Sequence, residues 1–203
     1  MTRFDRDTGA ALLTALLVLV AVLIIGVSAA QAALNAEKSA RNERDRHIAF
    51  QAAEAGLLDA ERDIEGGFDP GSARAALFAS GSALGFAEGC GRGKDNANLG
   101  LCAYAPVAPA WQTAELANAD GAATTPYGKF TGAVLPIGGG ALPSGAPRYI
   151  IELMPLVRAG DDAGPRADNL YRITAIGFGV RANTQVVLQE FYRKVAPGRG
   201  SLQ

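Results

Sequence analysis

The sequence predicts an α+β protein with one long N-terminal helix, whose second half packs on a C-terminal antiparallel sheet. An uncharged apolar run, Ala10 to Ala30, continues into a polar helical pattern that reaches Glu65 without a proline. Three segments rich in β-branched and aromatic residues follow near the C-terminus. A helix followed by consecutive strands is typical of an α+β fold, and 203 residues leave room for one modest globular domain beside such a helix.

The apolar run is long enough to cross a membrane. Its roughly 21 residues, at about 1.5 Å each, give a helix of about 31 Å, against about 30 Å for the hydrocarbon core of a bilayer. We therefore expect a membrane-spanning helix over residues 10–36. Two alternatives stay open at this point: a secretory signal that is cut near Ala30-Gln31-Ala32, and a single-span anchor that is never cut.

The continuation of the helix, residues 37–66, is amphipathic. Apolar side chains recur at spacings of three and four, which predicts a stripe that packs under the sheet and is formed by Phe50, Ala53, Leu57, Ala60 and Ile64. The polar positions that we expect on a solvated face are Glu43, Arg44, His47, Gln51, Glu54, Asp59, Arg62 and Asp63. Gly66-Gly67 should end the helix, because glycine adopts the left-handed terminating conformation at little cost.

Residues 67–203 make up the expected globular domain. Its first part is rich in Gly, Ala and Pro and shows only one short helical pattern, near Ala73 to Phe78. Strands are expected at Arg148–Met154, Leu170–Val180 and Thr184–Val195, and the short gap around Asn183 predicts a hairpin between the last two. The small residues at the end of the middle strand, Ala175, Gly177 and Gly179, share one face and would let a helix approach closely.

The chain has two cysteines, Cys90 and Cys102, which enclose a segment rich in glycine, asparagine and charge. A disulfide between them is the expected use, and closing a loop of this length would contribute about 3 kcal/mol in the chain-entropy model. Such a bond implies an oxidising compartment. A pair of free thiols is the alternative.

No pattern predicts an enzyme, a cofactor or a metal site. No serine lies in a nucleophile elbow, no histidine is near either cysteine, and the carboxylates form no recognisable metal set. The triplet Gly138 to Gly140 lacks the lysine of a phosphate loop and is better interpreted as a turn, and Asp161-Asp162 as a solvated turn. A net charge of −1 gives no global reason to bind nucleic acid.

Three features carry a resemblance to a known family. They are a hydrophilic leader that ends in Gly9, the run AALLTALLVLVAVLIIGVSA directly after it, and the segment RDRHIAFQAAEAGLLDAE. Together they resemble the N-terminal region of PilX-type minor pilins of type IV pili, over about the first 65 residues. The C-terminal segment YRITAIGFGVRANTQVVLQEFYRKV is similar to the same group, although less specifically.

The resemblance implies a type IV pilin-like fold and a defined processing route. A prepilin peptidase would remove residues 1–9 by cutting after Gly9, and the new amino terminus at Ala10 would be methylated. The protein would sit in the inner membrane with its globular domain in the periplasm, and would then join a pilus fibre or its tip. Its implied partners are membrane lipid, the prepilin peptidase, the inner-membrane assembly machinery, other minor pilins and the major pilin.

One position departs from the major pilins of the family, which place a glutamate at the fifth mature position. This chain has Thr14 there. A hydroxyl can bond to a carbonyl of its own helix and attracts no amine. We therefore hypothesise that the protein is not the repeating subunit, and that it helps to initiate assembly or lies at or near the tip. Small residues suited to close helix packing are Ala11, Ala15, Ala21 and Gly26.

Two other functions stay open on the sequence alone. One is a minor pseudopilin of a type II secretion system, which shares the same helix and peptidase site. The other is a binding module at the fibre tip, either an adhesin or a DNA-uptake protein, although nucleic acid is not the partner we expect. The basic residues available for phosphate contacts would be Arg158, Arg172, Arg181, Arg193 and Lys194.

Overall fold

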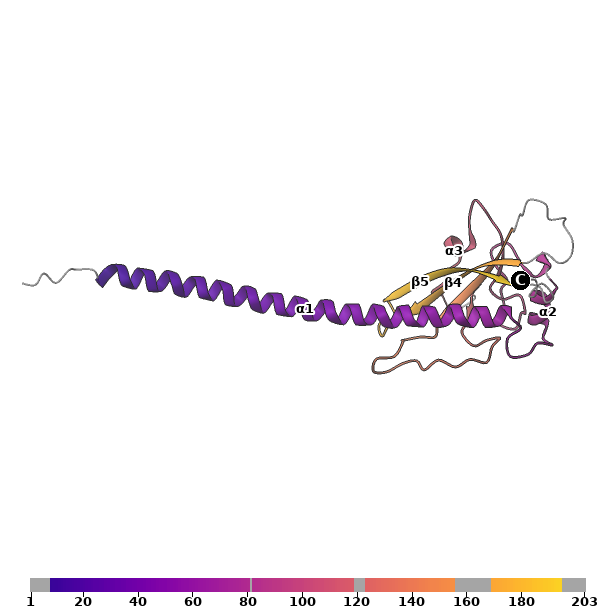
Figure 1. Cartoon of the computed structure of the whole chain (residues 1–203), viewed down its shortest axis with the longest axis horizontal. Helices are drawn as coiled ribbons and strands as arrows, with labels where there is room; N and C mark the ends of the chain where they lie inside the picture. The colour runs from indigo at the N-terminus through magenta and orange to yellow at the C-terminus, as the bar shows by residue number, and fades with distance from the viewer. Residues whose placement is uncertain (1–7, 81, 119–122, 156–168, 195–203) are drawn as a thin grey trace, which may run out of the picture. The chain divides into compact units, whose positions relative to one another are not determined.

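The structure is a computed structural model that describes residues 8–80, 82–118, 123–155 and 169–194. It confirms the predicted α+β class, with one long helix before a sheet (Figure 1). The elements are α1 (Thr8–Ile64), α2 (Ala73–Ala79), η1 (Ala83–Gly85), β1 (Leu101–Ala103), α3 (Ala110–Thr113), β2 (Thr125–Pro126), β3 (Arg148–Met154), β4 (Asn169–Phe178) and β5 (Gln185–Lys194).

The chain divides into two compact units, Met1–Arg44 and Asp45–Gln203. In the first unit, every described side chain from Ala11 to Arg44 is exposed. α1 is the one helix, among the described residues, that is long and apolar enough to cross a membrane. Its residues from Asp45 onward belong to the second unit, together with the sheet.

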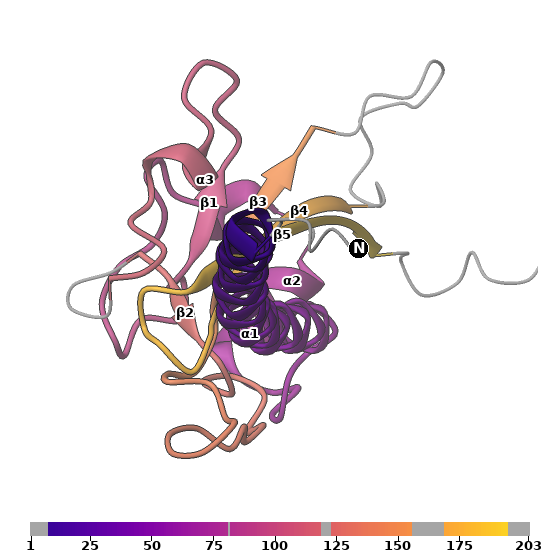
Figure 2. The ribbon, with the colours of Figure 1, turned by 90° about the vertical axis from the view of Figure 1, so that its left-hand side faces the viewer.

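The sheet has the order β1-β3-β4-β5, with β2 paired to β3 (Figure 2). β3, β4 and β5 pair antiparallel, as the sequence predicts. β1 is parallel to β3, which makes the whole sheet mixed and was not expected. A strand of three residues, Leu101–Ala103, is too short to leave a periodic pattern, and its pairing depends on a partner about 50 residues away.

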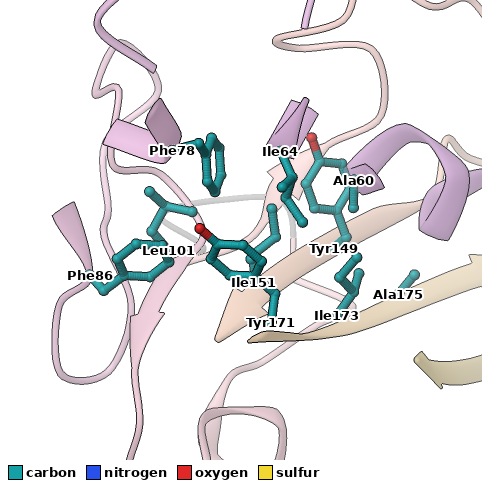
Figure 3. Packing of buried hydrophobic residues seen from close by; sticks show 10 residues of the cluster. All are labelled: Ala60, Ile64, Phe78, Phe86, Leu101, Tyr149, Ile151, Tyr171, Ile173 and Ala175. Atoms are coloured by element: carbon teal, nitrogen blue, oxygen red, sulfur yellow. The ribbon is translucent and has the colours of Figure 1, made fainter. Parts of the chain in front are cut away.

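One face of the sheet packs against α1 and α2. On this face the register pairs Tyr149 with Ala175 and Ile151 with Ile173. Figure 3 shows these side chains in one cluster, which the aromatic rings of α2 and the following segment complete. The members of the cluster are Ala60, Ile64, Phe78, Phe86, Leu101, Tyr149, Ile151, Tyr171, Ile173 and Ala175. The opposite face of the sheet carries a second core around Ile150 and Ile176.

Gly177 lets α1 approach β4 as closely as the sequence predicts. A Cβ atom at this position would overlap backbone atoms of Ala49 and Ala53 on α1. One turn further along the helix, Gly56 approaches the side chains of Ala175 and Pro147. The absence of side chains at both contact points therefore sets the distance between helix and sheet.

The buried face of α1 is wider than the predicted stripe and is centred to one side of it. Ala53, Ala60 and Ile64 are fully buried, Leu57 is half-buried, and Phe50 is 39 % exposed. The prediction of a solvated position was wrong for Asp59 and Asp63, which are fully buried. Both carboxylates lie beside the stripe and find partners on distant segments, described below, that a helical pattern cannot reveal. Positions that are exposed as predicted are Glu43, Arg44, His47, Gln51, Glu54 and Arg62.

The double glycine ends α1 as expected. Gly66 and Gly67 have φ angles of 117° and 62°, and the Gly67 amide donates to the Arg62 carbonyl at 2.8 Å. The predicted short helix is present as α2, which begins at Ala73 after the N-cap Ser72. The expected strand end at Val195, like residues 1–7 of the leader and Asp161-Asp162, lies outside the described residues.

Candidate assembly interface

The described part of the first unit is an apolar helix whose side chains are exposed. Its large side chains are about 45–75 % exposed, and nothing lies within 4 Å of where a Cβ of Gly26 would be. The small residues Ala11, Ala15 and Ala21 are exposed as well. Because exposed apolar surface on this scale is unfavourable in water, lipid or other helices must cover it.

The hydroxyl group of Thr14 forms a hydrogen bond within its own helix. Its Oγ1 donates to the carbonyl of Ala11 at 3.0 Å, one turn back along α1. Ser28 does the same with Ile24 at 2.8 Å. Neither side chain therefore needs a polar partner in lipid, and neither provides a charge to attract an amine. The predicted processing site, Gly9-Ala10, lies in the first turns of α1.

In the second unit, Asp63 forms a buried network with Arg74 of α2. Arg74 Nη2 lies 2.7 Å from Asp63 Oδ2, and Arg74 Nη1 donates to the carbonyls of Ala97 and Leu99 at 2.7 and 2.8 Å. The Tyr149 hydroxyl donates to Asp63 Oδ2 at 2.9 Å. Burial and the charge of Asp63 raise the pKa of Tyr149 well above its usual value, so this hydroxyl stays a donor. The network joins α1, α2, β3 and the segment before β1.

Asp59 holds a different segment. Its carboxylate accepts hydrogen bonds from the Gly128 amide, at 2.7 Å, and from the Thr131 hydroxyl. Burial raises the pKa of Asp59 in spite of these bonds. The turn that follows β2 is thereby fixed to α1.

Asp45 holds the turn between β4 and β5. It accepts from the Val180 amide at 2.6 Å, from Arg181 Nε at 2.9 Å and from the Thr184 hydroxyl at 2.6 Å. Burial acts to raise the pKa of Asp45, but the bonds from Thr184, Arg181 and Val180 outweigh it and lower the pKa to about 2. The hairpin turn is therefore anchored to α1 by an ionised carboxylate.

On the opposite face of the sheet, Glu152 anchors the segment that contains α3. It accepts two bonds from Arg172, each at 2.8 Å, and one from the Ala110 amide at 3.0 Å. The hydrogen bond to Glu152 is the main reason that the pKa of Arg172 is raised. The charges of Arg172 and Glu152 therefore pair with each other inside the domain.

The predicted disulfide between Cys90 and Cys102 is present. Both cysteines are buried in the core on the α3 side of the sheet. Within the loop that they close, the Gly91 amide donates to the Leu101 carbonyl at 3.0 Å and the Gly100 amide to the Gly91 carbonyl at 3.1 Å. The loop is therefore fixed to β1 by backbone bonds as well as by the disulfide.

The basic residues considered for phosphate binding do not gather into one patch among the described residues. Arg172 bonds to Glu152, and Arg181 to Asp45. Lys194 donates to the Ile64 carbonyl on the α1 side of the sheet, whereas its neighbour Arg193 alternates to the other face. Arg158 lies outside the described residues. The basic residues within the described ranges therefore form no common face for phosphate contacts.

Comparison with known proteins gives the family. A family described as type IV pilus assembly protein PilX, C-terminal part, matches residues 78–194, and the PilX N-terminal family matches residues 8–58. The chain belongs to the PilX family. This PilX protein is therefore a minor pilin of a type IV pilus, a structural subunit whose partners are other pilins, and the match favours the pilus over a type II secretion system. No curated protein and no solved structure matched the chain.

The three buried aspartates of this PilX protein are the residues that sequence reasoning missed. One signal was available: Asp59 and Asp63 are one turn apart and directly precede Ala60 and Ile64 of the apolar stripe. Acidic residues that flank a buried stripe can be buried when a partner exists, and the partner of Asp63, Arg74, lies in the short predicted helix.

Proposed function

We propose that this PilX protein helps to initiate pilus assembly and lies at or near the pilus tip. The observation that carries the proposal is the self-satisfied hydroxyl of Thr14, at the position where the major pilins of the family have a glutamate. An ionised carboxylate in the membrane is costly unless it is paired, which gives a glutamate there a strong preference for an amino terminus of a neighbour. Thr14 has no such preference.

The physical consequence concerns the order of assembly. A subunit that joins a growing fibre uses its glutamate to find the amino terminus of a subunit already in place. A subunit that starts the fibre has no predecessor and needs no such charge. Its own amino terminus would still be available to the next subunit that carries a glutamate. Thr14 is thus compatible with a first position and unsuited to a repeating one.

The same proposal includes processing and location. A prepilin peptidase would cut after Gly9 and leave Ala10 as a methylated amino terminus, with residues 10–36 in the inner membrane. The domain from residue 67 onward would lie in the periplasm and then on the fibre. The disulfide supports this placement, because such bonds persist in oxidising compartments.

The first test is the amino-terminal sequence and mass of the mature protein from its native membrane, with and without an active prepilin peptidase. We expect a methylated Ala10 terminus only when the peptidase is active. A terminus at Met1 or near Ala33 in both samples would overturn the processing step.

The second test addresses position in the fibre. Thr14→Glu should raise the number of copies per pilus and distribute them along its length, measured by quantitative mass spectrometry and immunogold labelling of sheared pili. Thr14→Ser is the matched control, because it keeps a hydroxyl. An unchanged copy number and location in Thr14→Glu would contradict the proposed role of this position.

A further inference from the structure

β5 is an open edge of the sheet. Among the described residues, no strand pairs with its outer side. None of its ten residues is buried, and exposed and half-buried side chains alternate from Gln185 to Lys194. Five consecutive residues of the neighbouring strand β4 are buried, Ile173–Gly177. Long uncovered edges of this kind can pair with another chain, and soluble proteins usually protect them.

Apolar side chains lie on both sides of this edge. On the face away from α1, Val187 is 48 % exposed and Phe191 is 63 % exposed. On α1, Leu58 and Phe50 are exposed as well. Because Glu61 and Glu65 of α1 interact with side chains of β5, this flank of the helix borders the edge. A chain laid along β5 would therefore contact apolar groups with alternate residues on either face.

A pair of carboxyl groups lies between this flank of α1 and β5. Glu61 lies close enough to Glu190 for its negative charge to act on the Glu190 carboxyl group, and Glu190 Oε1 is buried with no hydrogen-bond partner among the described residues. Burial, followed by the charge of Glu61, raises the pKa of Glu190 to about 6. The other polar groups nearby are already paired: the Tyr192 hydroxyl donates to Glu65, and Lys194 lies 4.0 Å from Glu65 and bonds to Ile64.

We propose that β5 receives an extended segment of another pilin, which adds a strand to the sheet and places a lysine or arginine beside Glu61 and Glu190. Backbone pairing would satisfy the open edge, and the apolar side chains of the segment would cover Val187 and Phe191. The cation would give the buried Glu190 Oε1 a partner and would offset the repulsion between the two carboxyl groups. A lipid surface has no backbone N–H and C=O groups in strand geometry that could pair with β5. The proposal rests on the role as a pilus subunit and is independent of a tip location.

Site-specific photo-crosslinking tests this in cells that assemble pili. A photoreactive residue replaces Val187 or Phe191 in the full chain, and the control replaces Val134, which is 88 % exposed on the segment between β2 and β3. We expect at least tenfold more adduct from the two β5 positions than from the control, and a single extended pilin segment with a lysine or arginine in the crosslinked peptides. Yields equal to the control, or adducts only with lipid or with residues 195–203 of the same chain, would overturn the proposal.

The charge of the occupant is tested separately. Glu190→Lys should reduce the adduct at Phe191 by about tenfold, because like charges in contact oppose binding. Reversing the lysine or arginine of the crosslinked partner segment to glutamate should restore it. Glu88→Lys, at an exposed acidic position outside this edge, is the matched control and should leave the yield unchanged. A fall in yield that partner reversal does not rescue would contradict the assigned charge pair.

Two readouts keep the result interpretable. The Cys90–Cys102 disulfide is assayed in each variant by thiol labelling, so that misfolding is recognised. The amino terminus is sequenced from the same samples. A mature Ala10 terminus without β5 crosslinks would refute strand addition alone, whereas crosslinks with an uncut Met1 terminus would refute the processing route alone.

Discussion

Asp63 of α1 and Arg74 of α2 form an ion pair at 2.7 Å in which both side chains are buried. The guanidinium also lies 4.2 Å above the ring centre of Phe130. This pair falls between the two segments that match the PilX family, residues 8–58 and 78–194. The pair connects α1 to the sheet-containing part of the subunit, because Asp63 also accepts from Tyr149 of β3 and Arg74 also donates to the carbonyls of Ala97 and Leu99.

Removal of the cation should be strongly destabilising. Arg74→Ala leaves the Asp63 carboxylate buried and uncompensated, and we expect a loss of about 3–5 kcal/mol in the free energy of unfolding. Denaturant unfolding of the detergent-solubilised full chain, followed by the fluorescence of the single tryptophan, Trp111, measures this. Arg62→Ala on the exposed face of α1 is the control. The double variant Asp63→Leu/Arg74→Met should be less destabilised than Arg74→Ala, and equal losses would argue against an uncompensated charge.

The anchor at Asp45 should depend on pH in the acid range. Its pKa is lowered to about 2 in the folded protein, so its stabilising contribution is present above the ordinary value of 3.8 and is lost as the pH falls from about 4 to 2. Asp45→Asn should cost about 1–2 kcal/mol at pH 7, because hydrogen bonds to a charged acceptor are replaced by weaker ones. The difference between variant and parent should shrink towards pH 2 in unfolding experiments. A difference that is constant across this range would contradict an ionised anchor.

The contribution of Glu190 to the free energy of unfolding should change with pH in the opposite direction. Its pKa is raised to about 6 from 4.5, so the folded state is favoured fully below pH 4.5 and loses this contribution as the pH rises through 6. Glu190→Gln should therefore be more stable than the parent at pH 7.5, by at most about 1 kcal/mol because the side chain is partly exposed, and should lose this advantage at pH 4.5. Thermal unfolding at the two pH values measures the difference. Glu88→Gln is the control, and an equal gain there would remove the link to the carboxyl pair.

The closeness of α1 to β4 can be tested at one glycine. Gly177→Ala places a Cβ against the helix backbone at Ala49 and Ala53, which cannot move aside as a flexible side chain could. We expect a cost of about 3 kcal/mol, the upper part of the range for overpacking. Gly145→Ala, whose Cβ would meet only a ring atom of Phe178 at 3.8 Å, should be nearly neutral in the same unfolding assay. Equal effects at both sites would show that the contact is not tight.

The parts of this fold that the sequence predicts are those with a local pattern. The apolar run, the double glycine, the hairpin around Asn183 and the disulfide all follow from residues close together in the chain. β1 does not, because its three residues acquire strand geometry from β3. The buried state of Asp59 and Asp63 also depends on distant partners, the turn after β2 and Arg74.

Part of the candidate interface could also be predicted from the sequence, and part could not. Thr14 could be recognised from its position in the apolar run, and its hydroxyl bonds to the helix as expected. The open side of β5 could not be recognised from the sequence, because an edge strand is defined only when the order of all strands is known. The same holds for Glu61 and Glu190, which are 129 positions apart in the chain.

The three buried aspartates of α1 hold three different segments of the domain at fixed positions along the helix. Asp45 and Asp59 are separated by about 21 Å of helix, and Asp59 and Asp63 by about 6 Å, at 1.5 Å per residue. Each fixes a different segment by its own short set of hydrogen bonds. Evolution can therefore exchange one turn without moving the others, provided that the incoming segment keeps the donors that its aspartate requires. The same helix α1 could in this way support different surface segments in related subunits.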